Sequence, residues 1–548
     1  MKSSNPNPSW QADIAAVLII TLAAGLLRWL YGNAFLAAFP QALTPANDAR
    51  AYWELSLAIY REGWLLRDHG PFYQAPLYPY ALACLHHLGY HLVRQVIAFQ
   101  LVLGVINVLL TYVMARFWLP APWAGLAALV FAFSPLPLIF ETKLLATTLG
   151  LMLYLLFALA LLAWVRWGGW PWLMTTGLLY SLAVLCRPNQ LFALPFILLL
   201  IAWVSAKRNQ LAIWRSALQY ALPFLLIVMM GIAPVTLRNA LIGGDPVPIT
   251  GNTGVTLYMG TNPHAQGGLA PIEGLSNDIE DQRTQSIALA EERSGQSMTA
   301  AEASRWWIGE TLRWAAGHPL EFILLESKKL IWALYAVPPA VNYSLHFEST
   351  FFPWLDWLNA ATILILAGGL AALPLLFPLR PDQRSVMLAI LAGYLLLSLI
   401  YYASDRFLAA VLPFLAVLMA QFLQRCRAGL ARKQALALGL AAALALLLAA
   451  NPWLGWNAPR ETANGFYNLG VFYEERGADR QAEQAYRDAL EYQPNHIATM
   501  LNLGVLLAEQ GDLRTSTRLF EQVLEAQPGH PLAQRNLQIN RRRMQGSP

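Results

Sequence analysis

Residues 14–30 read IAAVLIITLAAGLLRWL, an apolar run that contains a single charged side chain. A helix needs about 20 such residues to cross the hydrocarbon core of a bilayer. With 57% hydrophobic residues and 20 Trp among 548 residues, the chain is too apolar for a soluble protein. The sequence therefore predicts an all-α polytopic membrane protein with about eleven spans, at residues 13–31, 96–118, 121–139, 144–166, 171–186, 189–205, 216–236, 353–378, 385–402, 406–424 and 432–450.

The distribution of basic residues predicts the orientation of these spans, because cytoplasmic turns are enriched in Lys and Arg. We interpret the first span as retained, with the N-terminus in the cytoplasm. The cytoplasmic turns then hold one acid, Asp382, and these basic residues: Arg116, Arg166, Lys207, Arg208, Arg215, Arg380, Arg384, Arg425, Arg427, Arg432 and Lys433. The prediction is a multi-pass protein of the bacterial inner membrane, with the large loop 237–352 and the C-terminal region outside the cytoplasm. The net charge of +5 reflects this bias and does not indicate nucleic-acid binding.

The first external loop, TPANDARAYWELS at residues 44–56, concentrates charge in a chain of which only 13% is charged. It carries Asp48 and Tyr52, and a second aromatic loop with Tyr78 follows at residues 70–80. An acidic, aromatic loop beside a membrane indicates a site at the lipid–water boundary. The alternative is that Asp48 caps a short helix that begins at Ala49, and both interpretations can hold together.

Two further external turns carry candidate residues. Glu141 and Lys143 lie in FETK at residues 140–143, where an acid and a base also suit the end of a helix. Arg187 lies in CRPN at residues 186–189. Its guanidinium group matches a phosphate geometrically, although it could equally extend to the membrane interface.

The turn YYASDRF at residues 401–407 contains Arg406, followed by Pro413 in the next span. The alternative to a functional role is a structural Asp405–Arg406 anchor at the interface. Arg238 opens a loop at residues 237–263 that is rich in Gly, Asn, Pro and Thr and in which tight turns are expected. Glycine permits close approach to a ligand, so we expect this loop to wall a sugar pocket.

The sequence of the rest of the large loop predicts short secondary structure elements. Val247–Ile249 and Val255–Tyr258 suggest small strands, residues 275–316 an amphipathic helix, and residues 319–336 a helix on the outer leaflet. In that last helix, Lys328 and Lys329 face either water, which we favour, or an anionic headgroup. Three histidines near residue 87 suit the polar face of an interfacial helix better than a metal site, so no metal ligands are assigned.

The layout of these external motifs over about residues 10–450 resembles the GT-C class of membrane glycosyltransferases. The nearest match is the family 39 group, which includes protein O-mannosyltransferases and aminoarabinose transferases. The resemblance implies a polyprenyl-phosphate sugar donor, a hydroxyl acceptor on a protein, lipid or glycan, and no required cofactor, although some members of the class use a divalent metal. It implies Asp48 as general base with Glu141 as a second acidic group, and as substrate-binding residues Lys143, Arg187, Arg406, Tyr52, Tyr78 and Arg238.

The C-terminal residues 460–548 are polar and repetitive, in contrast to the preceding domain at residues 1–452. NLG at residues 468–470 recurs at 502–504, Gly477 recurs as Gly511, and Tyr486 as Phe520, always 34 residues later. This is the period of tetratricopeptide repeats, which pair two helices per repeat. The repeats either stabilise the membrane domain passively or dock an acceptor protein or an assembly partner.

Two other functional classes share parts of this pattern. A transporter of lipid-linked sugars would have similar spans, but it usually shows internally repeated spans with polar groups inside the membrane. Here the polar groups gather at the external ends of the spans. A non-catalytic, membrane-anchored repeat scaffold would account for the repeats but not for eleven spans and clustered external charges.

Overall fold

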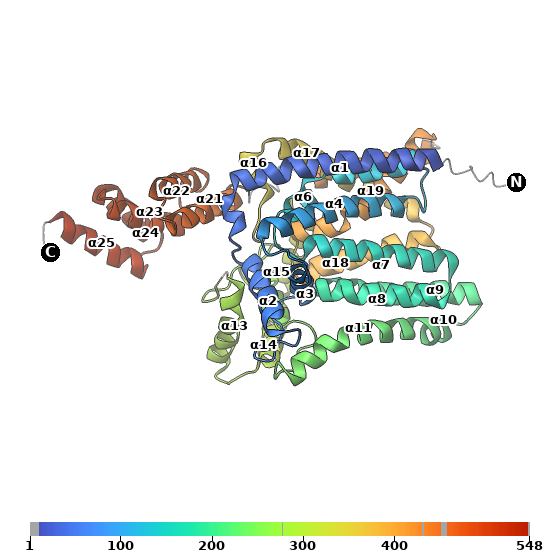
Figure 1. Cartoon of the computed structure of the whole chain (residues 1–548), viewed down its shortest axis with the longest axis horizontal. Coiled ribbons are helices and arrows are strands. Elements are labelled where there is room, and N and C mark those ends of the chain that lie inside the picture. The colour runs from blue at the N-terminus through green and yellow to red at the C-terminus, as the bar shows by residue number, and fades with distance from the viewer. Residues whose placement is uncertain (1–9, 277, 430–431, 451–457, 546–548) are drawn as a thin grey trace. The chain divides into compact units, whose positions relative to one another are not determined.

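The computed structural model describes residues 10–276, 278–429, 432–450 and 458–545, and these residues contain helices and turns but no strand. They divide into two compact units (Figure 1). The membrane unit comprises residues 1–339 and 358–451, and the repeat unit comprises residues 340–357 and 452–548. The expected boundary between residues 452 and 460 falls largely on residues 451–457, outside the described residues, as do the side chains of Arg432 and Lys433.

Each of the eleven predicted spans coincides with a helical segment, but fewer are long enough to cross a membrane. Eight such helices occur in the described residues, or nine if a bent pair counts as one span. The eight are Trp10–Ala38 (α1), Val93–Ala115 (α4), Thr147–Trp167 (α7), Pro188–Asn209 (a 3-10 turn and α9, Leu194–Asn209), Ile213–Leu241 (α10, Ile213–Ser216, and α11, Leu222–Leu241), Trp354–Ala371 (α17), Gln383–Ile400 (α18) and Asp405–Arg427 (α19).

The count of eleven is not confirmed, and the remaining three runs show why. The run at 121–139 is broken into α5 (Ala121–Ala132) and α6 (Pro135–Glu141), bent by 58°. The nitrogen of Pro135 has no hydrogen to donate, so the first helix cannot continue through it. The other two helices are short: α8 (Trp170–Cys186) has 17 residues, and the described apolar part of α20 (Arg432–Ala449) is residues 439–449.

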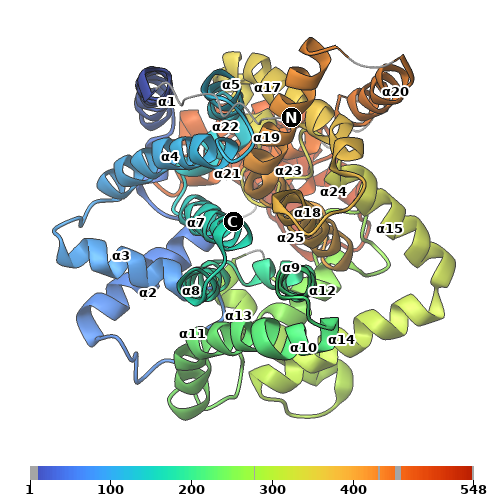
Figure 2. The same ribbon diagram turned by 90° about the vertical axis from the view of Figure 1, so that its right-hand side faces the viewer.

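The core of the membrane unit lies around α7 and α19, the most enclosed of these helices, with 78% of the apolar window buried in each. Viewed along the spans, α19 lies among α4, α5, α7 and α18 (Figure 2), all of which pack against it. Alanines such as Ala409, Ala416 and Ala420 make this surface small enough for close helix contacts. Four surrounding helices therefore hold α19, which carries Arg406 in its first turn.

The loops of the membrane unit form short helices at one end of the spans (Figure 1). These are α2 (Asp48–Glu62), α3 (Leu77–His87), α12 (Thr253–Gly260), α13 (Ile279–Ser294), α14 (Ala300–Gly317) and α15 (Pro319–Ala333). The expected strands are wrong, because residues 255–258 lie in α12 and no strand occurs in the described residues. The single helix expected over 275–316 is two helices, separated after Gly295, whose φ is 71°. The expected position of α15 on the outer leaflet stays a prediction.

Two glycines of this loop permit close approach to neighbouring backbone, and the expected sugar pocket beside the loop stays a prediction. A Cβ atom at Gly254 would come within 1.9 Å of the Ser304 carbonyl oxygen, and one at Gly260 within 1.9 Å of the Tyr401 carbonyl oxygen. Real atoms cannot approach so closely, so both positions require glycine. The glycines thus fasten α12 against α14 and against the turn that follows α18.

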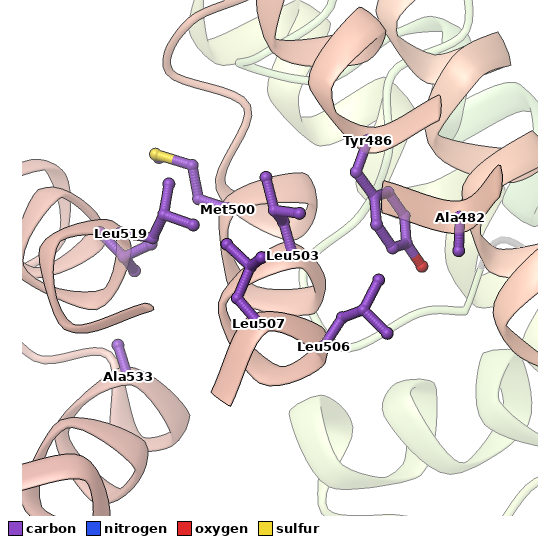
Figure 3. Packing of buried hydrophobic residues seen from close by; sticks show 9 residues of the cluster. Ala482, Tyr486, Met500, Leu503, Leu506, Leu507, Leu519 and Ala533 are labelled. Carbon is purple, nitrogen blue, oxygen red and sulfur yellow. The ribbon is translucent and has the colours of Figure 1, made fainter. Parts of the chain in front are cut away.

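The repeat unit has the helix order that the 34-residue period predicts. Its helices are α16 (Leu345–Phe351), α21 (Ala458–Glu474), α22 (Asp479–Tyr492), α23 (Ile497–Glu509), α24 (Leu513–Ala526) and α25 (Pro531–Met544). Gly477 and Gly511 adopt φ values of 68° and 92° in the turns between paired helices. Leu503, Leu506 and Leu507 of α23 pack between Tyr486 of α22 and Leu519 of α24 (Figure 3).

One helix of the repeat unit, α16, comes from outside the repeats and was not anticipated from the sequence. The partly buried carboxylate of Glu461 on α21 accepts hydrogen bonds from the Ala340 N–H, at 3.0 Å, and the Ser344 hydroxyl, at 2.9 Å. The rings of Phe347 and Phe466 lie 5.2 Å apart, centroid to centroid. Residues 340–351 thus cover the first repeat helix.

We expect Gly470→Val to destabilise the repeat unit by about 1–3 kcal/mol, because overpacking forces neighbouring atoms apart. A Cβ atom at Gly470 would lie 2.5 Å from the Tyr486 ring. Native-state hydrogen exchange of peptides from residues 458–545, in the full chain, measures the change. Gly529→Val is the control, because nothing lies within 4 Å of its Cβ position, and its effect should stay within about 0.5 kcal/mol. Equal effects of the two variants would contradict the packing of Gly470 against Tyr486.

Candidate active site

Asp48 is the first residue of α2, so the helix begins one residue earlier than the capping interpretation expects. The N-cap is Asn47, whose φ of 50° lies in the left-handed region that side chains other than glycine rarely adopt. The Asp48 carboxylate instead pairs with Arg406, with Oδ2 3.0 Å from Nη1. Both side chains are 16% exposed. The strained backbone at Asn47 thus precedes a carboxylate that is aimed at another segment of the chain.

Arg406 is presented by the first turn of α19. Ser404 caps this helix, and both the Ser404 hydroxyl and the Asp405 carboxylate accept the Arg406 backbone N–H, at 3.2 and 2.7 Å. Asp405, the residue of the alternative structural anchor, contacts Arg406 through this backbone N–H. The Arg406 Nε and Nη2 atoms are buried without a hydrogen-bond partner among the described residues. Arg406 thus pairs with Asp48 and keeps two donors for another group.

Arg187 lies beside Arg406, although 219 residues separate them in sequence. Its side chain is 9% exposed, and its Nη1 donates to the Arg406 carbonyl oxygen at 3.2 Å. Its guanidinium carbon is 5.9 Å from the centroid of the Phe407 ring. The two guanidinium groups lie near the carboxylates of Asp48 and Asp405, so the feature that suits an anionic ligand is the pair of unused Arg406 donors.

A pocket adjoins these arginines between α7, residues 187–193, α18 and α19. Its wall is mainly aromatic and aliphatic, with polar groups near Arg187. The Asn189 Oδ1 atom is buried without a hydrogen-bond partner in the described part of the chain. The lining includes Arg187, Asn189, Tyr154, Tyr394, Leu397 and Phe407. The pocket therefore combines an apolar interior with a cationic wall.

Tyr52 and Tyr78 connect the surroundings of Asp48 to the turn at residues 140–143. Their rings pack edge to face, with centroids 5.2 Å apart. Burial raises the pKa of Tyr52, and the negative charge of Asp48 raises it further, so the phenol stays protonated and can donate a hydrogen bond. The Tyr78 hydroxyl donates to Gln100 Oε1 at 2.7 Å, and Gln100 Nε2 donates to the carbonyl oxygens of residues 141 and 143. Gln100 was missed, although a lone Gln in an apolar span was a usable signal.

Glu141 is held by a residue that sequence reasoning did not single out. Arg28 of α1 donates from Nη2 to Glu141 Oε1 at 2.8 Å, and both side chains are 3% exposed. The carboxylate lies over Gly104, where a Cβ atom would come within 2.2 Å of its carbon. The signal for Arg28 was that it is the one charged residue within residues 14–30. Its position makes Glu141 part of a buried ion pair, and the predicted catalytic role of Glu141 stays a prediction.

Lys143 and Arg238 make contacts within the protein itself. The Lys143 ammonium donates to the Thr142 hydroxyl at 2.9 Å and lies 3.7 Å from the centroid of the Phe35 ring. Arg238 donates to the carbonyl oxygens of residues 65, 66, 69 and 70 and stacks on the Phe72 ring. Arg238 therefore folds the loop that precedes α3, and its predicted contact with substrate, like that of Lys143, stays a prediction.

The donor set at Asp48 does not fit a divalent cation. Asp48 is paired with Arg406, and Arg187 is close by, so a cation would have to displace an arginine from the carboxylate. Among residues 10–276, 278–429, 432–450 and 458–545, no three His, Cys, Asp or Glu side chains gather as a ligand set.

We expect Arg28→Met to destabilise the membrane unit by about 3–5 kcal/mol, because it leaves the Glu141 carboxylate buried without its counter-charge. Unfolding of the purified full chain by titration with dodecyl sulfate measures this loss. The double variant Arg28→Met/Glu141→Gln should recover much of it, since a neutral amide costs less to bury than a carboxylate. Additive losses in the double variant would contradict the pairing.

Comparisons with known proteins cover part of this arrangement. Residues 71–237 match the family model described as dolichyl-phosphate-mannose-protein mannosyltransferase, and residues 463–496 match a tetratricopeptide repeat model. The first match includes Tyr78, Glu141, Lys143 and Arg187, whereas Asp48 and Arg406 lie outside it. No curated protein sequence matches the chain.

Two solved structures from Archaeoglobus fulgidus show a remote likeness. One is its oligosaccharyltransferase with Zn and sulfate, at 15% identity and a TM-score of 0.42, over 83% of this chain and 55% of that one. The other is its oligosaccharyltransferase AglB with an inhibitory peptide and a dolichol-phosphate, at 15% identity and a TM-score of 0.37, over 84% and 58%. The chain thus spans little more than half of those proteins, and the TM-scores are too low to transfer a fold or an activity. The family matches confirm the resemblance stated from the sequence: residues 71–237 resemble the protein mannosyltransferases, and residues 463–496 are a tetratricopeptide repeat.

Proposed function

We propose that this protein is a membrane glycosyltransferase that moves a sugar from a polyprenyl-phosphate donor to a hydroxyl group outside the cytoplasm. One observation carries the proposal. The Asp48 carboxylate is paired with an arginine that has two further buried donors, beside a second arginine and an apolar pocket. A carboxylate suits a general base, and the arginines suit a phosphate. The match over residues 71–237 supports the same class of donor.

In the proposed reaction, Asp48 takes the proton of the acceptor hydroxyl while the oxygen of that hydroxyl attacks the anomeric carbon of the sugar. The new bond joins the acceptor oxygen to that carbon. The bond between the carbon and the phosphate oxygen breaks, and its electron pair leaves with the phosphate. Donors aimed at the developing charge accelerate such a step, which is the role proposed for Arg406 and Arg187.

The remaining candidates fit around this centre as positions for substrate. Tyr52 is close enough to Asp48 for the carboxylate to raise the pKa of its phenol, which remains a hydrogen-bond donor. The repeat unit would bind an acceptor protein or an assembly partner, and the acceptor side of the reaction would face the periplasm of a bacterial envelope.

The test is transfer by the purified full chain from synthetic polyprenyl-phosphate sugars to hydroxyl acceptors. We expect release of polyprenyl phosphate that depends on the acceptor and on a compatible sugar. No release from any donor in a panel of hexosyl and pentosyl lipids would overturn the proposal. It would favour the scaffold role, which the tetratricopeptide match at residues 463–496 supports independently.

A further inference from the structure

Lys329 is completely buried, contrary to the expectation from the sequence that this part of α15 faces water or a lipid headgroup. Its side chain is 0% exposed. All three hydrogens of its ammonium group have acceptors: Thr261 Oγ1 at 2.8 Å, Glu326 Oε1 at 2.7 Å and the Leu399 carbonyl oxygen at 2.8 Å. A buried charge is costly unless it is paired and hydrogen-bonded, so this degree of satisfaction indicates a specific role for the site.

The Leu399 carbonyl belongs to the last turn of α18, which ends at Ile400. The final carbonyl groups of a helix have no partner within it, and a cation there also interacts favourably with the helix dipole. Lys329 therefore fixes the point at which the chain leaves α18. Seven residues later the chain reaches Arg406.

The turn between α18 and α19 is held from the same side at two further points. The Ala403 N–H donates to the Gly267 carbonyl oxygen at 2.9 Å. Gly260 touches the Tyr401 carbonyl so closely that no side chain could replace its hydrogen. Gly260 and Thr261 are adjacent, so the contacts of Lys329 and Gly260 belong to one clamp around residues 399–403. Ser404 then caps the helix that carries Arg406.

We infer that Lys329 is a positioning residue for the donor site: it holds the turn at residues 400–404 and thereby keeps Arg406 against Asp48. The inference rests on the proposed function for its catalytic consequence but not for its structural one. Arg406 reaches Asp48 through one nitrogen at 3.0 Å. A small shift of the turn would therefore move both its contact with the base and its two free donors.

Lys329→Met tests the inference, with Lys328→Met as the matched control. Lys328 is the preceding residue of the same helix, is exposed, and donates to the Gln266 side chain at 2.6 Å. We expect Lys329→Met to raise deuterium uptake in peptides covering residues 400–406 and to raise KM for the donor on the order of 10- to 100-fold, as a displaced binding group does. The control should do neither. A merely structural role would lower the active fraction, and hence apparent kcat, at an unchanged KM.

The two readouts separate this inference from the proposed function. Unchanged uptake at residues 400–406 in Lys329→Met overturns the inference whatever the activity. Raised uptake with an unchanged KM also overturns it, because Arg406 would then not depend on the turn. If the wild-type protein releases no polyprenyl phosphate, the proposed function fails, and the uptake alone decides whether Lys329 holds the turn. Should Lys329→Met not fold, Thr261→Val removes one of the three acceptors and should raise uptake in the same peptide to a smaller extent.

Discussion

Asp48→Asn is expected to lower kcat for the release of polyprenyl phosphate by about 10²- to 10⁴-fold, the usual contribution of a general base. The amide has the shape of the carboxylate, and its oxygen can still accept the hydrogen bond from Arg406 that Asp48 accepts at 3.0 Å. It cannot take a proton from the acceptor hydroxyl. The fold and the affinity for the donor should therefore survive while the chemical step fails. Initial rates at saturating donor, with a thermal unfolding curve for each variant, measure both.

Glu54→Gln is the control for this variant, because Glu54 lies on the same helix and its side chain is exposed. It should retain wild-type turnover. Undiminished release by Asp48→Asn would place the base elsewhere. Glu141 would be the next candidate, although its carboxylate is paired with Arg28 inside the span bundle.

Arg406→Lys is expected to lower kcat/KM by about 10²- to 10³-fold, the effect of removing a donor that stabilises charge in the transition state. Arginine presents several N–H groups in one rigid plane, so it can pair with Asp48 and still offer Nε and Nη2 to a phosphate. A lysine ammonium cannot hold Asp48 and at the same time present two donors in one plane to a phosphate. The loss should appear both in kcat and in KM for the donor. Arg406 would bind the phosphate of the intact donor and would also stabilise its charge as it leaves.

Arg427→Lys provides the matched control at the opposite end of the same helix, where the side chain is exposed. Its turnover should equal that of the wild type. If Arg406→Lys behaved in the same way as this control, the two free guanidinium donors would have no part in the reaction, and Arg187 alone would have to bind the phosphate.

The sequence predicted which residues lie in the external turns better than it predicted which of them contact one another. Apolar runs and charge bias placed Asp48, Arg187 and Arg406 in external turns, and the structure brings these turns together. No local pattern states that residues 358 positions apart form an ion pair, as Asp48 and Arg406 do. Glu141 shows the same limit: its type and turn suggested chemistry, but its partner Arg28 lies on another span.

The errors in the fold have a common physical origin in local patterns that tertiary contacts override. Short apolar strips such as residues 255–258 suit a strand or a buried helix equally, and packing of Gly254 on α14 decides for the helix. Lys329 looked solvated because a lone lysine usually is. Its burial is tolerated because its ammonium group has three acceptors, and the sequence does not show that two of them, Thr261 and Leu399, meet α15.

The placement of α16 bears on how such a protein can change over evolutionary time. Its phenylalanines, Phe347 and Phe351, rest on Phe466 of the first repeat helix, and Glu461 of that helix holds the loop that leads into α16. A descendant that lost the chain from residue 452 onward would expose the aromatic side chains of Phe347 and Phe351 to solvent. Truncation at one end of the gene would then favour polar replacements far upstream, around codons 340–351. Lineages with and without the tail should differ in both places together.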